Sequence, residues 1–331
     1  MGGDHGPVVT VAAAAQALAR HPTLELILVG DEPTLIQSLQ DQKLAGSARV
    51  SITHAAQVVE MHERPSLALR GKRESSMRKA IDLVKEGQAM ACVSAGNTGA
   101  LMAIGRYVLK TLPGIDRPAI CATLPGLGKT THVLDLGANV DSTSEELFRF
   151  AVMGAVLAEA VDNRENPSVA LLNIGEEEIK GNDRVKQTAV LLAKSPLNYV
   201  GFVEGDGIFA GKVDVIVCDG FVGNVALKAS EGVARMLGDI ARQEFKRSWF
   251  TKLGAVFAGP TLKALRNRAD PRRYNGASLV GLRGIVIKSH GSADALSFEH
   301  AIDVAVLEVE KAVPERISHL LEELLASSEA S

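Results

Sequence analysis

The sequence predicts an α/β protein with a doubly wound, mostly parallel sheet covered by helices on both faces. The first observation is that short apolar runs alternate along the chain with longer segments of helical periodicity. The second is that nearly every apolar run ends in glycine plus a small polar residue. The third is size, because 331 residues, 46% of them apolar, can bury a large core. We therefore expect a single α/β domain over residues 1–331.

The expected elements can be placed in order along the chain. Residues 7–20 are expected to form the first helix. Continuous apolar runs predict buried strands at residues 24–30, 89–96, 119–126, 131–139, 168–177, 199–207, 213–220 and 284–291. Most of these runs are followed by helical periodicity, which is clearest at residues 144–161 and 225–242. This order favours parallel strands joined by helical crossovers.

Bulk properties exclude several classes of protein. A net charge of -3 gives no reason to expect a nucleic-acid partner. Cys92, Cys121 and Cys218 lie far apart in apolar runs and match no metal spacing, so we expect reduced core residues of a cytosolic protein. No run reaches the roughly 18 apolar residues of a membrane-spanning helix, and the first residues lack a signal-peptide pattern. The sequence thus indicates a soluble or peripheral protein.

Glycine-rich strand ends are the main indication of function. They are SAGNTG (94–99), LGAN (136–139), NIGEEE (173–178), EGDG (204–207), DGFVGN (219–224) and SHGSAD (289–294). In an open α/β sheet, ligands bind beyond the carboxyl ends of the strands, and backbone N–H groups at helix starts attract anions. We expect these six ends to converge on one edge of the sheet, where they would bind an anionic ligand.

Several common catalytic motifs are absent from the sequence. There is no GxxxxGK[ST] nucleotide loop, no GxSxG elbow, no HExxH zinc helix and no GxGxxG fingerprint between a strand and a helix. Neither a cofactor nor a metal ion is therefore expected. Asparagines, lysines and a histidine recur instead near the loops, and these groups suit an oxyanion and a bound phosphate.

Longer motifs resemble those of the bacterial phosphate acyltransferase family. The motifs are MGGDHGP, RGKRESSM, VSAGNTGALMA, DLGANVD, NIGEEEIKGN, NYVGFVEGDGIF, VIVCDGFVGNVALKASEG, YNGASLVGL and GIVIKSHGSADA. Together they cover nearly the whole chain. The resemblance implies transfer of an acyl group from acyl-[acyl-carrier-protein] to inorganic phosphate, which starts phospholipid synthesis. It also implies a fold like that of isocitrate and isopropylmalate dehydrogenases and of phosphotransacetylase, usually in a homodimer, and a membrane-bound glycerol-3-phosphate acyltransferase that takes the product.

The implied mechanism is direct attack of phosphate on the thioester carbonyl. The enzyme then has to hold phosphate, align it and stabilise the tetrahedral oxyanion. The expected phosphate and substrate contacts are Asp4, Lys72, Ser75, Ser76, Gly96, Thr98, Gly99, Asp219, Gly220, Gly223, Lys228 and His290. Asn97, Asn139 or Asn224 would donate to the oxyanion. His5 would take a proton from monobasic phosphate, because the pKa of histidine lies near neutrality.

Each of these residues also has a structural interpretation. Asp4 and His5 are near the amino terminus and can simply be solvated, and Lys228 can be a surface residue of a helix. His290 can cap a helix, and Ser75 and Ser76 can form an N-cap pair. Asn139 can occupy a left-handed turn position without touching a ligand. These alternatives remain open from sequence alone.

The segment 244–273 predicts a basic amphipathic helical hairpin. Eight basic residues stand against two acidic ones, and residues 259–260 (Gly-Pro) separate two helices. The expected membrane or carrier-protein contacts are Lys246, Arg247, Trp249, Phe250, Lys252, Leu253 and Phe257. An apolar stripe flanked by basic residues suits an anionic membrane surface, and the same charges suit an acidic carrier protein. Packing in the core or in a dimer interface is the alternative.

The opening MGGDHGP raises a further expectation. Its composition is that of a tight functional loop, and such loops normally follow a buried strand. Members of the resembled family carry a short apolar strand ending in Asp-Ala before this loop. We therefore expect the codons before Met1 to encode such a strand in frame.

Two other functions remain to be separated from acyl transfer to phosphate. A phosphotransacetylase would act on a small coenzyme A thioester and need no long apolar tunnel. A non-catalytic phosphate- or lipid-binding scaffold would release no thiol. The location implied by the resemblance is the cytoplasm, at the inner face of the plasma membrane.

Overall fold

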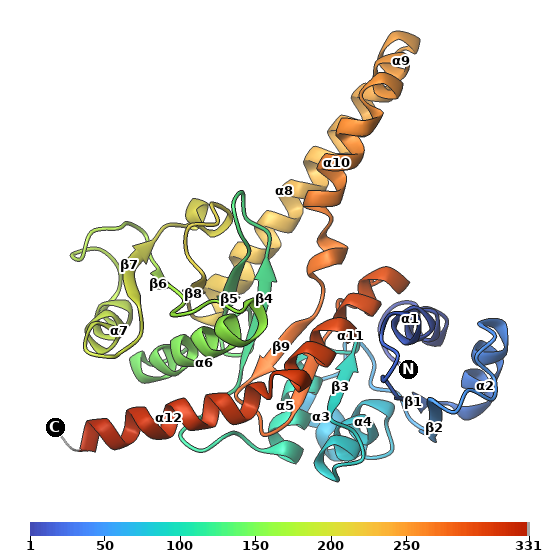
Figure 1. The fold of residues 1–331 in the computed structure, drawn as a ribbon, viewed down its shortest axis with the longest axis horizontal. Coiled ribbons are helices and arrows are strands. Elements are labelled where there is room, and N and C mark those ends of the chain that lie inside the picture. The colour runs from blue at the N-terminus through green and yellow to red at the C-terminus, as the bar shows by residue number, and fades with distance from the viewer. Residues whose placement is uncertain (330–331) are drawn as a thin grey trace.

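The protein consists of one α/β body and a long helical arm that projects from it (Figure 1). The computed structural model describes residues 1–329, without the side chains of residues 265–269, 271 and 325–329. The elements are α1 (Pro7–Arg20), β1 (Leu26–Gly30), α2 (Glu32–Asp41), β2 (Val50–His54), α3 (Pro65–Gly71), α4 (Ser76–Lys85), β3 (Ala91–Ser94), α5 (Thr98–Leu109), β4 (Ala119–Leu124), β5 (Thr131–Leu134), α6 (Ser144–Asp162), β6 (Val169–Leu172), α7 (Asp183–Ala193), β7 (Tyr199–Val203), η1 (Gly205–Phe209), β8 (Val215–Val217), α8 (Gly220–Lys246), α9 (Trp249–Phe257), α10 (Gly259–Ala269), η2 (Pro271–Tyr274), β9 (Ala277–Val280), β10 (Ile285–Lys288), α11 (Ala295–Glu310) and α12 (Val313–Glu329). All the predicted strands and the helix at residues 7–20 are confirmed, whereas β2 and β9 were not predicted.

The main sheet has eight strands in the order β3-β10-β9-β4-β5-β8-β6-β7. The pairs β3–β10, β5–β8, β8–β6 and β6–β7 are parallel, while β10–β9, β9–β4 and β4–β5 are antiparallel. Because these three antiparallel pairs lie between the two parallel groups, β3 and β10 run opposite to β5, β6, β7 and β8. The expected convergence of six carboxyl ends on one edge is therefore wrong. The cause is the two short connections β4–β5 and β9–β10, each of which reverses the chain without a crossover helix.

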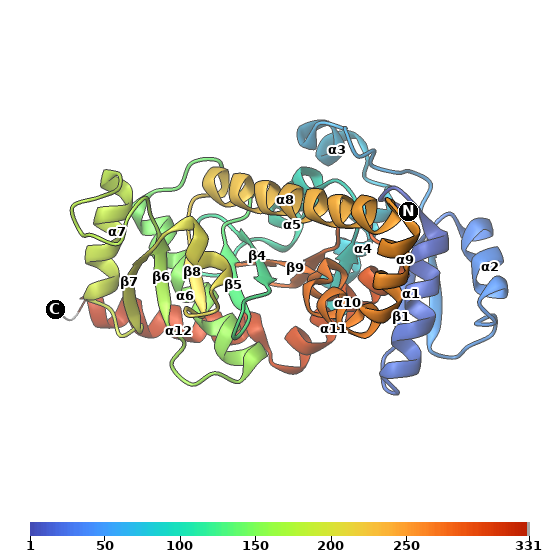
Figure 2. The same ribbon diagram turned by 90° about the horizontal axis from the view of Figure 1, so that it is seen from above.

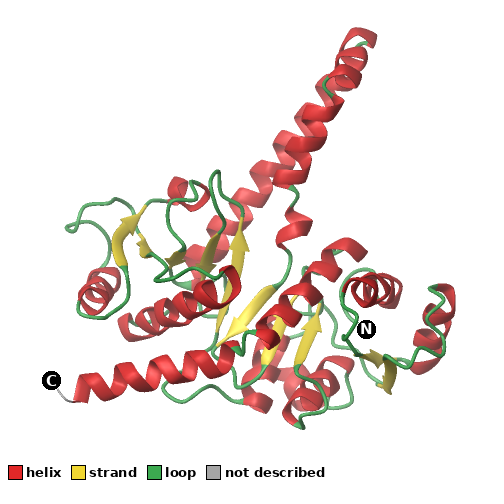
Figure 3. Ribbon diagram, viewed as in Figure 1, coloured by secondary structure: helices red, strands yellow, loops and turns green. Residues whose placement is uncertain are grey.

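Helices cover both faces of this sheet, as the sequence predicts (Figures 2 and 3). On β8, Ile216 packs into the cluster with α4, α5 and the start of α8, whereas Val215 and Val217 pack into the cluster with α6 and α12. Successive side chains of a strand point to opposite faces, so a strand buried on both sides needs an unbroken apolar run. All three cysteines are buried as expected, and burial raises the pKa of the Cys92 thiol to about 12.

The first residues lie next to the separate two-stranded sheet formed by β1 and β2. The amino group of Met1 donates to the carbonyl of Val29 on β1 at 3.3 Å. The hydroxyl of Ser76, at the start of α4, donates to the Met1 carbonyl at 2.7 Å. The loop that begins the chain is therefore held between β1 and α4.

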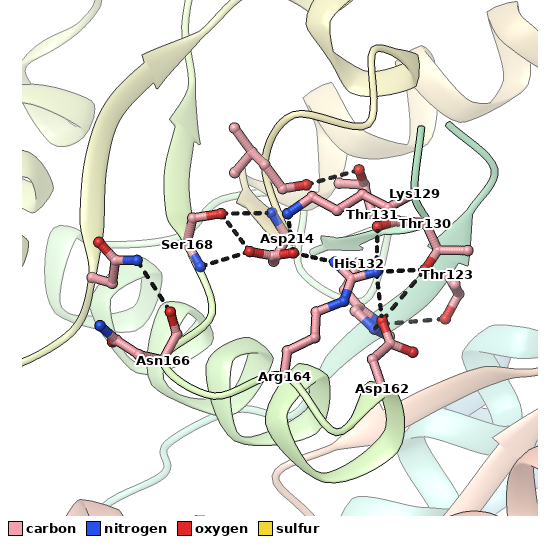
Figure 4. Close-up of polar contacts among 12 residues, drawn as sticks. Thr123, Lys129, Thr130, Thr131, His132, Asp162, Arg164, Asn166, Ser168 and Asp214 are labelled. Carbon is pink, nitrogen blue, oxygen red and sulfur yellow. Dashed lines mark hydrogen bonds and ion pairs between the residues drawn. The ribbon is translucent and has the colours of Figure 1, made fainter. Parts of the chain in front are cut away.

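A dense polar cluster ties together the amino ends of β5, β6 and β8 (Figure 4). Asp214 forms ion pairs with Lys129 and Arg164 and accepts the N–H of Ser168 at 2.9 Å. Burial disfavours the charged carboxylate, but the hydrogen bonds from these three residues outweigh it and hold the pKa of Asp214 well below its usual value. The cluster lies at the opposite ends of these strands from the glycine-rich loops at residues 136–139, 173–178 and 219–224, and we interpret it as structural.

Glu308 on α11 predicts how stability depends on pH. Its side chain is buried, one carboxyl oxygen accepts from the Ser278 hydroxyl at 3.0 Å, and burial raises the pKa of Glu308 to about 8. The folded state thus retains a proton that the unfolded state releases near pH 4.5, so stability falls as pH rises from 4.5 to 8. The side chain in Glu308→Gln stays neutral. We therefore expect the free energy of unfolding of this variant to change by several kcal/mol less across this window than that of the unaltered protein. Urea unfolding at pH 5 and pH 9 measures the difference. Equal pH dependence of the two proteins would contradict this role.

The arm consists of the distal part of α8 together with α9 and α10 (Figure 1). Helices α9 and α10 lie in segment 244–273, but α8 begins at Gly220 in the body, so the arm is longer than the predicted hairpin. None of the side chains of α9 is buried. No helix within residues 1–329 is both long enough and apolar enough to cross a membrane.

Candidate functional site

Basic side chains gather beside α8 on residues from distant parts of the chain. Lys228 lies on α8, Lys288 ends β10, and His290 follows in the loop before α11. The charge of Lys228 acts on both Lys288 and His290, while the carboxylates of Glu231 and Asp4 act on His290 with the opposite sign. We call Lys228, Lys288 and His290 the cation cluster. An anion is the ligand that these charges favour.

Lys288 is the member of the cluster that sequence analysis did not assign to the site. Its side chain is only 9% exposed and its ammonium donates to the carbonyl of Ser289. Burial and the neighbouring charge of Lys228 lower the pKa of Lys288 to about 8, with Asp4 opposing them. A buried lysine is costly unless it binds an anion. The signal in the sequence that could have identified Lys288 is its position at the end of the apolar run GIVIK.

His290 is held in place by its own loop and by the base of the arm. Its Nδ1 lies 2.8 Å from the Ser292 hydroxyl, and its backbone N–H donates to the Asn275 side chain at 2.9 Å. The same Asn275 side chain donates to the Ser289 hydroxyl at 2.8 Å. Partial desolvation and the charge of Lys228 lower the pKa of His290. The imidazole is therefore neutral at physiological pH, and these bonds fix its loop.

The amino-terminal loop lies against the cation cluster. The N–H of Asp4 donates to the Gly291 carbonyl at 2.8 Å. A side-chain carbon on Gly291 would lie 3.6 Å from the Asp4 carboxylate, and one on Gly3 would lie 3.0 Å from both the Gly291 carbonyl and the Ala95 methyl. At Gly3, where φ is +78°, glycine fits without displacing a neighbour. His5 follows Asp4 with an exposed side chain, so both predicted residues lie at this end of the sheet.

The predicted residues at the start of α5 lie beside the same loop. The Cα of Gly96 lies 3.4 Å from where a side-chain carbon of Gly2 would stand. Thr98 and Gly99 form the first turn of α5, and Gly99 has Pro65 against it. The carboxyl ends of β3 and β10 and the first residues of the chain thus form one surface.

Asn97, in this surface, has a structural role. Its Oδ1 accepts the N–H of Ala100 at 3.0 Å as the N-cap of α5. Its Nδ2 donates to the carbonyls of Met61 at 2.8 Å and Glu63 at 2.9 Å. An amide has two donor hydrogens and both are used here, so the geometry does not support the expected role as an oxyanion donor.

This arrangement gives a prediction for stability. Asn97→Ala removes a helix cap, worth about 1 kcal/mol, and leaves two carbonyls without donors, so we expect unfolding to become easier by about 3 kcal/mol. Asn182 is the matched control, because it caps α7 through a 3.0 Å bond from the Val185 N–H. Asn182→Ala should cost only about 1 kcal/mol. Equal losses in denaturant unfolding would mean that the bonds to residues 61 and 63 contribute nothing.

A second group of predicted residues lies at the opposite end of the sheet. Asp135 follows β5 and accepts the N–H groups of Ile120 at 2.9 Å and Asn139 at 2.7 Å. The Asn139 side chain donates to Asp135 at 3.0 Å and to the Pro118 carbonyl at 2.9 Å. Its donor hydrogens are therefore occupied, and Asn139 stabilises the loop instead of supporting an oxyanion.

The amino end of α8 is likewise satisfied within the protein. Gly220 donates its N–H to the Asn139 carbonyl, and Gly223 donates to the Asp219 carbonyl, both at 2.9 Å. The Asp219 side chain is the N-cap and accepts the N–H of Val222 at 2.9 Å. The expectation that Asp219, Gly220 and Gly223 hold phosphate here is thus not supported, because a carboxylate already caps the helix. Their close packing explains the glycines: a carbon on Gly223 would lie 2.0 Å from the Asp135 carbonyl oxygen.

Lys72, Ser75 and Ser76 also make internal contacts. Lys72 forms an ion pair with Glu63 at 3.0 Å. Ser75 is the N-cap of α4, which confirms the structural alternative, and Ser76 donates to Met1. These contacts occupy the ammonium of Lys72 and the two serine side chains, so the geometry does not support a phosphate site at residues 72–76.

Helix α8 connects the two ends of the sheet. Asn224, Lys228 and Glu231 follow one another at helical spacing and form one polar stripe. Asn224 lies against the loop after β5, where its Cβ is 3.3 Å from where a side-chain carbon of Gly137 would stand. Further along, Lys228 reaches the cation cluster. Asn224 is therefore the predicted oxyanion donor that remains available beside the cluster.

The described residues contain no group of three or more histidine, cysteine, aspartate or glutamate side chains arranged to hold a metal ion. The chemistry of the cluster is thus that of anion binding by lysines with a neutral imidazole beside them.

Comparison with known proteins places this geometry in context. A family model described as "Fatty acid synthesis protein" matches residues 1–316. Phosphate acyltransferase of Alkalilimnicola ehrlichii is 62% identical, over 100% of this chain and 96% of that protein. Phosphate acyltransferase of Methylococcus capsulatus is 60% identical over 99% and 96%, respectively.

Solved structures resemble the fold at low sequence identity. A phosphotransacetylase from Streptococcus pyogenes has a TM-score of 0.62 with 19% identity, covering 93% of this chain and 92% of that chain. A branched-chain phosphotransacylase from Enterococcus faecalis has a TM-score of 0.54 with 14% identity, covering 93% and 96%. These likenesses confirm a mixed α/β fold.

Proposed function

This chain belongs to the phosphate acyltransferase family, and from that premise we propose that it transfers a fatty acyl group from acyl-[acyl-carrier-protein] to inorganic phosphate at the cation cluster. The observation that carries the location is the convergence of Lys228, Lys288 and His290, with Asp4 beside them, from separate segments. A buried lysine in the site, paired at hydrogen-bond distance with no carboxylate among the side chains that the structure describes, suits a phosphate that arrives with the reaction.

We propose a role for each group. Lys228 and Lys288 hold the phosphate dianion, and Lys228 exchanges its 2.9 Å contact with Glu231 for the ligand. The backbone N–H of Ser292 donates to Nδ1 of His290 at 3.3 Å, so the neutral imidazole carries its hydrogen on Nε2 and donates it in a hydrogen bond to the phosphate. A phosphate oxygen then forms a bond to the thioester carbon, and Asn224 donates to the oxyanion. The carbon–sulfur bond breaks, and the leaving thiolate takes the proton that the phosphate group carried.

Phosphate-dependent release of thiol from acyl-carrier protein tests this function. We expect one free thiol and one acyl phosphate for each acyl group consumed, and no thiol release without phosphate. The same assay with acyl-coenzyme A identifies the thioester used. Release that is independent of phosphate, or no release at all, would overturn the proposal.

The arm supports a proposal about assembly. Val233, Met236, Leu237 and Ile240 are each about half exposed and recur at spacings of three and four residues on α8. Such a stripe is stable in water when a second helix covers it. We infer that α8 pairs with its counterpart in a homodimer.

The tip of the arm supports association with the membrane. Trp249 and Phe250 are stacked with 3.7 Å between ring centroids and are 65% and 67% exposed, and Val256 and Phe257 are exposed further along. Lys246, Arg247, Lys252 and Leu253 surround them. Exposed aromatics flanked by basic residues suit an anionic lipid surface. The proposed location is the cytoplasmic face of the membrane, where acyl phosphate would pass to a membrane-bound glycerol-3-phosphate acyltransferase.

The fold resembles phosphotransacetylases, and we propose more specifically that it is a variant of the fold of isocitrate and isopropylmalate dehydrogenases. The central antiparallel strands β9 and β4 between two parallel groups support this.

A further inference from the structure

A small apolar cavity lies between the sheet and the first turns of α8. Its volume is about 10 Å³, room for roughly one water molecule. Leu124 and Leu172 line it from the sheet, Leu136 from the loop after β5 and Phe209 from η1, and Leu227 closes it from α8. The residues of the sheet are buried, whereas Phe209 and Leu227 are half exposed. The cavity is therefore an apolar slot whose outer wall is a surface helix.

Helix α8 covers this slot only with its first turns. Its first turns lie over the sheet and the rest runs out into the arm (Figure 1), and among its residues only Gly220 and Gly223, in the first turn, are buried. Ala226 and Leu227 pack half-buried against the core and no later residue of the helix is buried, so the segment from Ala226 to Ser230 can open from the sheet at the loss of few apolar contacts. Apolar side chains of the sheet beneath it would then be accessible to a ligand.

Two neighbouring stripes on α8 join the slot to the site. Gly223, Ala226, Leu227 and Ser230 face the slot at helical spacing. Asn224, Lys228 and Glu231 lie one position further around the helix, and Lys228 belongs to the cation cluster. A ligand with a phosphate-reactive head and an apolar tail would thus place the head at one stripe and the tail under the other.

We propose that the fatty acyl chain of the substrate lies in this slot, between α8 and the side chains Leu124, Leu136, Leu172 and Phe209. The proposal rests on the proposed function. It adds the part of the site that distinguishes long acyl chains from short ones. The slot has almost no free volume when empty, so a long chain enters by displacing the segment of α8 from Ala226 to Ser230. A short acyl group reaches the cation cluster without displacing it.

Filling the slot is the direct test. In Ala226→Phe the new ring occupies the slot, and we expect kcat/KM for palmitoyl-carrier protein to fall more than tenfold relative to butyryl-carrier protein. The magnitude follows because each buried methylene contributes about fourfold in binding, so losing two of them is sufficient. Ala229→Phe is the matched control, because Ala229 is exposed on the same helix. Its ratio of kcat/KM for palmitoyl-carrier protein to kcat/KM for butyryl-carrier protein should equal that of the unaltered protein. An unchanged ratio in a folded Ala226→Phe protein would overturn the slot.

A binding measurement separates the slot from the proposed function. The three native cysteines are buried with raised thiol pKa values, so Ser230→Cys introduces the reactive thiol. In phosphate-free buffer, palmitoyl-carrier protein should slow its labelling by N-ethylmaleimide at least fivefold, and butyryl-carrier protein should not. Shielding without phosphate-dependent thiol release would retain the slot and reject the transferase. Thiol release without shielding would retain the transferase and reject the slot.

Discussion

Replacing Lys288 by methionine is expected to remove most of the acyl transfer and at the same time to stabilise the protein. Lys288 is the buried charge of the cation cluster, and loss of one such group at a developing anion typically lowers kcat/KM roughly a hundredfold. Its pKa falls from 10.5 to about 8 on folding, which corresponds to about 3 kcal/mol of destabilisation while the lysine is charged. Methionine has a similar length and no charge, so the variant avoids this cost.

The direction of the Lys288 pKa shift determines how the stability gain of Lys288→Met depends on pH. Below pH 8 the lysine is charged in both states and the folded state bears the full cost, which disappears as pH rises from 8 to 10.5. The stability gain of Lys288→Met should therefore be largest below pH 8. In the unaltered enzyme, kcat/KM for phosphate should fall above pH 8, because the free enzyme then loses this charge.

The control for this prediction is an exposed lysine. Lys194 follows α7 on the surface, and Lys194→Met should change neither unfolding nor kcat/KM. Denaturant unfolding and the phosphate-dependent thiol assay measure both quantities on each protein. A stable Lys288→Met protein with full activity would remove Lys288 from the site, and one that is less stable would show that its charge is satisfied in the fold.

The strands were predictable because burial on both faces leaves a simple pattern. The run at residues 213–220 became β8, with Val215 and Ile216 in different core clusters. The direction of the strands was not predictable in this way. β9 has only four residues, Ala277–Val280, and no apolar run announces it, yet its antiparallel pairing with β4 and β10 separates the glycine-rich ends.

The sequence predicted which residue types form the site better than it predicted the role of each residue. Lys228, His290 and Asp4 do come together, because their motifs end strands or lie on helix α8 that crosses between them. Asn97 and Asn139 have the same chemistry as an oxyanion donor, but their hydrogen bonds are used within loops. Sequence cannot distinguish an amide that binds a ligand from one that binds a carbonyl, since both require the same donor.

The arm is connected to the site at its base. Arg272 forms ion pairs with Asp270 at 2.6 Å and with Asp294, the N-cap of α11, at 2.9 Å. Asn275 binds the backbone of His290. Changes at the tip of the arm leave these contacts in place, so a variant altered there tests surface binding without altering the cation cluster.

Trp249→Glu combined with Phe250→Glu is expected to abolish sedimentation of the protein with anionic vesicles. Each aromatic side chain contributes roughly 2 kcal/mol on leaving water, so losing both lowers partitioning about a thousandfold, and the new charges add repulsion. Thiol release with soluble acyl-carrier protein should be unchanged. The matched control is Val190→Glu with Leu191→Glu, an exposed adjacent pair on α7 that adds the same charge to the body. Vesicle binding that survives in the arm variant, or is lost equally in the control, would reject the tip as the lipid contact, and a change in oligomeric state would assign the tip to the dimer instead.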